Sequence, residues 1–172
     1  DSMSAAVSPL AEVPEFTNLL IKFQNPVFGV LAGLILTAVI QSSSASVGIL
    51  QALCMTGAVS FGAAVPIIMG QNIGTTITAF IASLTANTQA RRAALAHMFF
   101  NVFGVVVVLL VFYPACDFIS WMVTDVMGGA DNPLYKLSAF HTAFNIANTL
   151  LLIWFVPQIE QFVCKVLPEK DA

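Results

Sequence analysis

The sequence carries very little charge. Only 15 of its 172 residues are Asp, Glu, Lys or Arg, which is 9%, whereas a soluble domain carries about 25%. This shortage excludes a soluble globular enzyme and a disordered polar tail. The six Lys and Arg residues, set against nine Asp and Glu residues, provide no basic surface for nucleic acid. The three cysteines lack a C-x-x-C spacing and lie in or beside apolar runs, where cysteine acts as a small hydrophobe.

Long apolar runs take the place of the missing charge. Hydrophobic residues make up 58% of the chain, and its mean hydropathy is +0.89. No charged residue occurs in the segments 23–90, 93–116 and 137–159. A membrane-spanning helix needs about 20 apolar residues, so the second and third segments each accommodate one helix. The sequence therefore predicts an all-α, multi-pass membrane protein, and we expect it to lie in the plasma membrane.

The first uncharged segment is interrupted by a polar cluster. An apolar run over residues 27–40 follows Asn25-Pro26 and ends at Gln41-Ser42-Ser43-Ser44, and a second run covers residues 47–59. Neither run is long enough to span comfortably. We expect a re-entrant helical hairpin over residues 26–59 that enters and leaves on one side, with its polar tip buried or lining a wet cavity. Gly29 and Gly33 have the spacing that lets helices approach closely.

The following stretch repeats this pattern. Apolar residues 61–69 and 77–86 flank the sequence Gly-Gln-Asn-Ile-Gly-Thr-Thr at residues 70–76. This predicts a discontinuous helix over residues 60–87, as in transporters; the alternative is an ordinary span that tolerates its glycines. Two full transmembrane helices are predicted at residues 93–113 and 136–156, followed by a cytosolic tail over residues 158–172.

The ends of the chain and its basic residues predict an orientation. Residues 1–24 have apolar side chains at helical spacing with charges between them, which predicts an interfacial amphipathic segment. The chain begins at Asp1 without a signal-peptide pattern, so we expect a piece of a longer protein. Placing the basic residues Arg91, Arg92, Lys165 and Lys170 in the cytoplasm puts the N-terminus outside and the C-terminus inside.

The two polar clusters hold nearly all the polarity predicted at membrane depth, and none of their residues is ionisable. A serine nucleophile would need a base and an acidic orienter, so we expect no catalytic residue, no enzyme activity and no cofactor. Helix N-termini bind anions without Arg or Lys, and helix carbonyl ends suit Na⁺. We expect half-helices to start near Ala45 and near Thr75, forming a neutral site that binds an anion and Na⁺ together. The candidate ligands are Gln41, Ser42, Ser43, Ser44, Gln71, Asn72, Thr75 and Thr76.

A short motif, H-x-x-F-N, occurs once on each predicted full helix. It places His97 with Asn101, and His141 with Asn145, on one helix face. These residues either face the binding cavity or form hydrogen bonds between helices. Two histidines without a nearby carboxylate make a poor metal site, so sodium is the only metal ion expected.

The pairing of Gln41-Ser42-Ser43-Ser44 with the Gly70–Thr76 motif resembles the type II sodium–phosphate cotransporter family, in its bacterial branch. The resemblance covers roughly residues 3–157 and includes the His97–Asn101 segment. It implies Na⁺-driven uptake of inorganic phosphate, with Na⁺ as the coupling ion. It also implies that Gln41, Ser42, Ser43, Ser44 and Asn72 line the substrate and sodium sites.

The family contains two inverted repeats, each with its own Q-S-S-S, whereas this chain has one. The chain resembles the second repeat. The resemblance therefore implies a partner repeat, in the same parent chain or in a pairing subunit, and a PhoU-like cytosolic domain as a further partner. We expect sodium-coupled phosphate transport with this chain supplying half of the binding site. The alternative is a non-transporting membrane scaffold that regulates phosphate signalling through a cytosolic partner.

Overall fold

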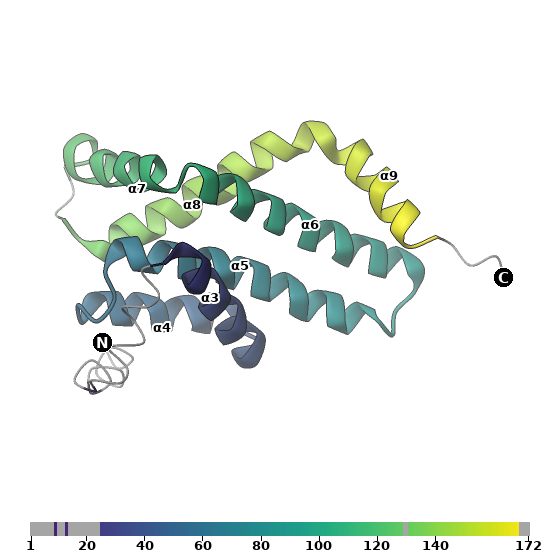
Figure 1. The fold of residues 1–172 in the computed structure, drawn as a ribbon, viewed down its shortest axis with the longest axis horizontal. Coiled ribbons are helices and arrows are strands. Elements are labelled where there is room, and N and C mark those ends of the chain that lie inside the picture. The colour runs from purple at the N-terminus through teal and green to yellow at the C-terminus, as the bar shows by residue number, and fades with distance from the viewer. Residues whose placement is uncertain (1–8, 10–12, 14–24, 129–130, 169–172) are drawn as a thin grey trace.

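The computed structural model describes Pro9, Val13 and residues 25–128 and 131–168, and these are helical with short connections (Figure 1). The predicted amphipathic segment over residues 1–24 lies almost entirely outside the described residues. Among the residues that the structure describes, three helical segments are long and apolar enough to cross a membrane: Phe61–Ser83, Thr88–Leu110 and Pro133–Val166. The prediction of an all-α membrane protein is confirmed at this level.

Two short helices form the first hairpin. Helix α3 (Pro26–Ile40) has 15 residues and α4 (Ser43–Met55) has 13, both fewer than the roughly 20 that cross a bilayer. The Asn25 side chain caps α3 by accepting a hydrogen bond from the Val27 N–H at 3.0 Å. The chain reverses at Gln41, whose φ of 56° is left-handed, an uncommon conformation for a residue other than Gly or Asn.

The third helix, α5 (Phe61–Ser83), runs through the Gly70–Thr76 motif without interruption. The predicted discontinuous helix is therefore wrong. The threonines of the motif do not interrupt the helix. Thr75 donates its hydroxyl proton to the Gln71 carbonyl at 2.9 Å, and Thr76 donates to the Ile73 carbonyl at 2.7 Å. Such bonds to the preceding turn are compatible with a continuous helix.

The glycines of this motif serve packing between α3 and α5. A Cβ atom on Gly70 would collide with the Val30 carbonyl oxygen, and one on Gly33 would collide with the Ile67 carbonyl oxygen. The two backbones are thus in direct contact, as small residues permit in membrane helices. The predicted close approach at Gly33 is confirmed. The same contact gives the glycines of α5 a packing role, although glycine disfavours helix formation.

The second half of the fold contains the other two candidate spans. Helix α6 (Thr88–Leu110) begins before the predicted residue 93 and is followed by α7 (Phe112–Trp121) and the π-helix η2 (Met122–Val126). Helix α8 (Pro133–Leu152) continues through the short 3₁₀ turn η3 (Ile153–Phe155) into α9 (Val156–Val166). The α8–α9 segment arches over α6 in Figure 1.

The helical segment that begins at Pro133 continues past residue 156, where the sequence predicts its end, and reaches Val166. Pro157 lies in the first turn of α9, where its missing N–H leaves no hydrogen bond unmade. The predicted tail therefore starts inside a helix. Helix α9 returns to the start of α6, where Arg92 Nε donates a hydrogen bond to the Leu167 carbonyl at 3.0 Å.

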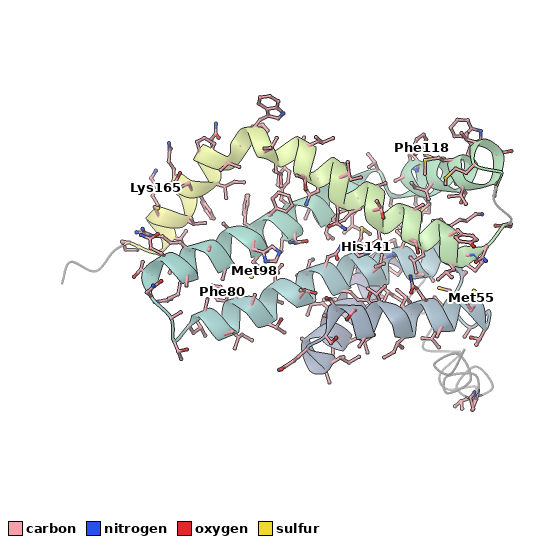
Figure 2. The ribbon with its side chains drawn as sticks, turned by 180° about the vertical axis from the view of Figure 1, so that it is seen from behind. Met55, Phe80, Met98, Phe118, His141 and Lys165 are labelled. Carbon is pink, nitrogen blue, oxygen red and sulfur yellow. The ribbon has the colours of Figure 1, made fainter. Side chains whose placement is uncertain are left out.

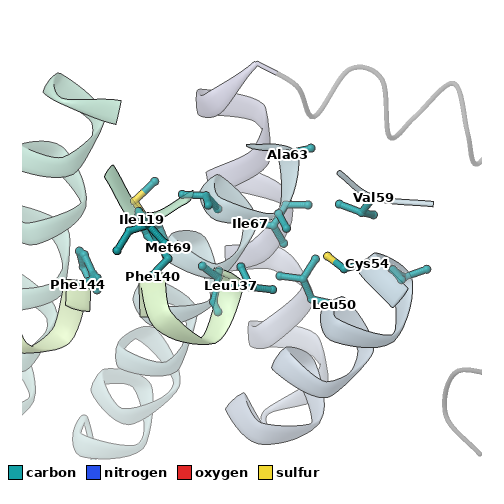
Figure 3. Close-up of a cluster of buried hydrophobic side chains, with 14 of the residues drawn as sticks. Leu50, Cys54, Val59, Ala63, Ile67, Met69, Ile119, Leu137, Phe140 and Phe144 are labelled. Atoms are coloured by element: carbon teal, nitrogen blue, oxygen red, sulfur yellow. The ribbon is translucent and has the colours of Figure 1, made fainter. Parts of the chain in front are cut away.

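A buried apolar cluster connects the hairpin, α5 and α8 (Figure 3). Leu50 from α4, Met69 from α5 and Leu137 from α8 are each at most 1% exposed. Many large apolar side chains, including Val39, Leu110 and Trp154, point outward, as expected for a surface that faces lipid. The cluster packs the second half of α4 and the first half of α5 against α8.

Candidate functional site

A cavity of about 480 Å³ lies where the start of α4, the middle of α5, α6 and α8 meet. Its volume is within the usual range for small-ligand pockets. No lining residue carries a carboxylate, an ammonium or a guanidinium group. The lining residues are Ser43, Ser44, Val47, Gln71, Asn72, Thr75, His97, Phe100, Asn101, His141 and Asn145.

The structure brings together most of the candidate ligands but leaves three aside. Gln41 is exposed at the hairpin turn and does not line the cavity. Ser42 caps α4, because its hydroxyl oxygen accepts a hydrogen bond from the Ala45 N–H at 3.3 Å. Thr76 is fully buried and bonded to its own helix. Both H-x-x-F-N pairs do line the cavity, which links two motifs far apart in the sequence.

The N-terminus of α4 points its first residues at this cavity. Ser43 and Ser44 are the first two helical residues and both line it. N–H groups in this position have no partner within the helix and carry part of the positive helix dipole. The second N-terminus expected near Thr75 does not exist, because α5 is continuous there. Anion donors on the α5 side must therefore come from side chains.

Gln71 is the most buried polar residue of the cavity wall, with 1% of its surface exposed. Its Nε2 donates to the Ser46 carbonyl at 3.0 Å, and the Ser46 hydroxyl is hydrogen-bonded to Thr37 at 2.9 Å. These bonds tie α3, α4 and α5 together. Gln71 Oε1, in contrast, is buried without a hydrogen-bond partner in the described structure. A buried acceptor without a partner costs about 1–3 kcal/mol, so this atom is suited to a cation or a water molecule.

Asn72, the neighbouring residue, leaves a hydrogen-bond donor unsatisfied where Gln71 leaves an acceptor. Its Oδ1 lies 3.0 Å from His141 Nε2 on α8, while its Nδ2 is buried and has no partner among the described residues. His141, labelled in Figure 2, lies between α8 and α5. The cavity wall therefore combines an unsatisfied acceptor at Gln71 with an unsatisfied donor at Asn72, both without charge.

The two asparagines of the repeated motif turn back on their own helices. Asn101 Nδ2 donates to the His97 carbonyl at 3.1 Å, and Asn145 Nδ2 donates to the His141 carbonyl at 2.8 Å. The two interpretations of the motif are thus not exclusive, because His141 both lines the cavity and bonds another helix.

Sequence reasoning missed two buried polar residues that hold helices together. Thr37 bonds Ser46, and Asn148 donates to the Phe100 carbonyl at 3.2 Å between α8 and α6. Asn148 also packs over Gly104, where a Cβ atom would collide with the Asn148 amide. The available signal was a lone polar residue inside an apolar run, which identifies neither its partner nor its role.

Comparison with known proteins places these features in context. The profile of the Na⁺/Pi-cotransporter family matches residues 1–123. The uncharacterized protein YqeW of Bacillus subtilis is 33% identical over 140 residues, which are 81% of this chain and 43% of YqeW. The rat sodium-dependent phosphate transport protein 2A is 41% identical over 91 residues, which are 49% of this chain and 14% of the rat protein.

Escherichia coli YjbB, named as a candidate inorganic phosphate export protein, is 29% identical over 147 residues, covering 83% of this chain and 25% of YjbB. The chain thus spans less than half the length of these relatives. No solved structure matches the chain.

Proposed function

The chain belongs to the Na⁺/Pi-cotransporter family, and from this premise we propose that it supplies one half of a site for sodium-coupled transport of inorganic phosphate. The names of its relatives support phosphate as the substrate and sodium as the coupling ion. The ligands proposed from the described residues are Ser43, Ser44, Gln71, Asn72 and Thr75 in the cavity wall, with Gln41, Ser42 and Thr76 supporting the hairpin tip and α5.

One observation carries this proposal: the neutral wall holds a buried free donor beside a buried free acceptor. Asn72 Nδ2 and the α4 N-terminus suit an anion, whereas Gln71 Oε1 suits a cation. Neither ion meets a charged side chain that would neutralise it. An anion and a cation about 4 Å apart attract by about 4 kcal/mol at an effective dielectric of 20. Each ion therefore offsets much of the other's desolvation, and binding of the two is coupled.

The shape of the hairpin supports the remaining parts of the proposal. Helices α3 and α4 are too short to span, and the α4 start lies beside the middle of α5. We place them as a re-entrant hairpin whose tip reaches the binding site from outside. A second repeat, in the parent chain or in a pairing subunit, would complete the site by inverted symmetry.

The positions of charged residues support the proposed orientation. Arg91 and Arg92 lie at the α6 start, next to the end of α9 that carries Lys165. Positive-inside asymmetry puts this end in the cytoplasm. The C-terminus would then be inside, where a PhoU-like domain could attach, and the N-terminus outside.

The test is uptake of ³²P-phosphate into proteoliposomes that contain the complete gene product. We expect uptake driven by an inward Na⁺ gradient and at least about 10-fold less uptake when K⁺ replaces Na⁺. Empty liposomes are the control. Equal uptake in Na⁺ and K⁺ would refute sodium coupling. No uptake by a well-folded protein would favour the non-transporting scaffold.

A further inference from the structure

The contact between His141 and Asn72 fixes what the Asn72 amide presents to the cavity. The two residues are 69 positions apart, and the hydrogen bond joins the middle of α5 to α8 at a distance of 3.0 Å. Asn72 has one acceptor and one two-proton donor group. Because Oδ1 is engaged by His141, Nδ2 is the group left buried without a partner in the described part of the chain.

This arrangement requires a particular protonation of the imidazole. A carbonyl oxygen accepts only, so His141 Nε2 must carry the proton. If the proton were on Nδ1 instead, Nε2 would be an acceptor and the Asn72 amide would turn over to donate to it. The cavity would then face an amide oxygen, which repels an anion and attracts a cation. The protonation of His141 Nε2 therefore determines whether the Asn72 amide directs its N–H groups or its oxygen at the cavity.

We infer that His141 is a positioning residue that holds the Asn72 amide with its N–H groups directed at the anion. The inference rests on the proposed function. His141 acts through Asn72 and need not touch the anion itself. It gives this side of a neutral site a fixed preference for anions, so that the cation is taken by Gln71 Oε1, the neighbouring free acceptor.

A purely structural role for this bond makes different predictions. The α5–α8 contact also contains buried apolar residues, including Met69, Leu137 and Phe140, so it does not depend on the hydrogen bond alone. If the bond only ties helices, its loss would lower thermal stability and leave the ion preferences unchanged. Asn148 offers a matched comparison, since it makes a bond between α8 and α6 from a position that does not line the cavity.

The test compares His141→Leu, His141→Gln and the control Asn148→Leu in the complete protein. The readouts are phosphate KM in proteoliposomes, equilibrium binding of inorganic phosphate in detergent, the Na⁺ concentration for half-maximal uptake, and melting temperature. Leu removes the donor, so we expect phosphate affinity to fall on the order of 10-fold with the Na⁺ requirement changed less than about 2-fold. Gln has an N–H₂ group that can replace Nε2, so it should restore phosphate affinity to within about 3-fold.

A double-mutant cycle makes the test specific. If His141 acts through Asn72, then His141→Leu should have no further effect on phosphate affinity in an Asn72→Ala background. Fully additive effects on phosphate affinity would overturn the inference. It would also be overturned if His141→Leu, like Asn148→Leu, lowered the melting temperature but left phosphate affinity unchanged. A wild-type protein that neither binds nor transports phosphate would overturn the proposed function and this inference together, whereas a transporting wild type with additive variants would overturn the inference alone.

Discussion

A side-chain amide can offer either a donor or an acceptor while carrying no net charge. Gln71 and Asn72 use this property at adjacent positions of α5, where one leaves Oε1 free and the other leaves Nδ2 free. Their remaining amide groups are fixed by Ser46 and His141. A charged side chain in this wall would be buried without a partner whenever the cavity is empty, which costs several kcal/mol per charge. A wall of neutral amides avoids this cost.

Asn72→Asp tests whether the anion lies beside Asn72. The change hardly alters volume but adds a negative charge. Two like charges about 5 Å apart repel by roughly 3 kcal/mol at an effective dielectric of 20, so phosphate affinity should fall on the order of 100-fold. Na⁺ affinity should hold or rise, because the charge favours a nearby cation. The measurement is phosphate KM and Na⁺ dependence of uptake by the complete protein.

Asn87→Asp is the matched control for this change. Asn87 caps α6 from an exposed position, and Asp caps equally well. It adds the same charge away from the cavity and should leave phosphate KM unchanged. A wild-type phosphate KM in Asn72→Asp would move the anion away from α5 and leave the α4 N-terminus as its remaining candidate.

At the scale of one helix, α5 shows how packing overrides local preference. Gly70 and Gly74 disfavour a helix by about 1 kcal/mol each relative to Ala. Their missing side chains let α3 approach so closely that carbonyl oxygens occupy the space of a Cβ atom. The helix therefore continues through a motif whose composition suggests a break.

Replacing these glycines should reveal this packing. Gly70→Ala forces α3 away from α5, so we expect a loss of stability of about 1–3 kcal/mol, as for other overpacked sites. The matched control is Gly62→Ala on the same helix, where a Cβ atom meets nothing within 4 Å; it should be neutral or slightly stabilising. Melting temperatures in detergent measure both. Equal melting temperatures for the two variants would show that α3 does not hold the backbone contact.

The hairpin proposal predicts a pattern of chemical accessibility. In a protein without native cysteines, Asn25→Cys and Ser60→Cys should react with an impermeant thiol reagent from the same side, because both arms return there. Ser43 lines the cavity. A reagent should therefore reach the thiol of Ser43→Cys only by entering the cavity, and Na⁺ plus phosphate should slow its labelling. Labelling of Asn25→Cys and Ser60→Cys from opposite sides would show that the segment spans the membrane. Unchanged Ser43→Cys labelling would remove the tip from the site.

Over the whole molecule, charge is divided between the two ends of the helices. One end has Arg91, Arg92 and Lys165, and the other has Asp131, paired with the buried Lys136 at 2.5 Å. Between them lie helices whose outward side chains are mostly apolar. This distribution supports the proposed direction of the molecule in the bilayer, with the Arg91 end in the cytoplasm.

The direction can be tested with two further cysteines. Thr88→Cys lies at the start of the candidate span Thr88–Leu110, and Asp131→Cys lies after that span, just before the next one, Pro133–Val166. They should react from opposite sides of intact cells, with Asp131→Cys accessible outside. Reaction of both from one side would mean that α6 does not cross the membrane.

The sequence predicts the positions of the apolar helices, because long segments that are apolar and lack charged residues are suited to contact with lipid. Residues 26–59 read as two short helices, and the polar residues Ser43, Gln71 and Asn72 stood out in apolar surroundings. The continuity of α5 could not be read from the same pattern, because the partner that fills the space beside Gly70 is α3, 40 residues earlier at Val30. The His141–Asn72 bond depends on how α8 crosses α5, and helical spacing fixes a face but not its neighbour.

The central claim is that one neutral cavity binds phosphate and Na⁺ together, and reciprocal binding measurements on the purified complete protein test it most directly. We predict that saturating Na⁺, compared with K⁺ at equal ionic strength, lowers the phosphate Kd by at least about 10-fold, and that saturating phosphate lowers the Na⁺ Kd by the same factor, as linkage requires. A phosphate Kd that is identical in Na⁺ and K⁺ would contradict the claim.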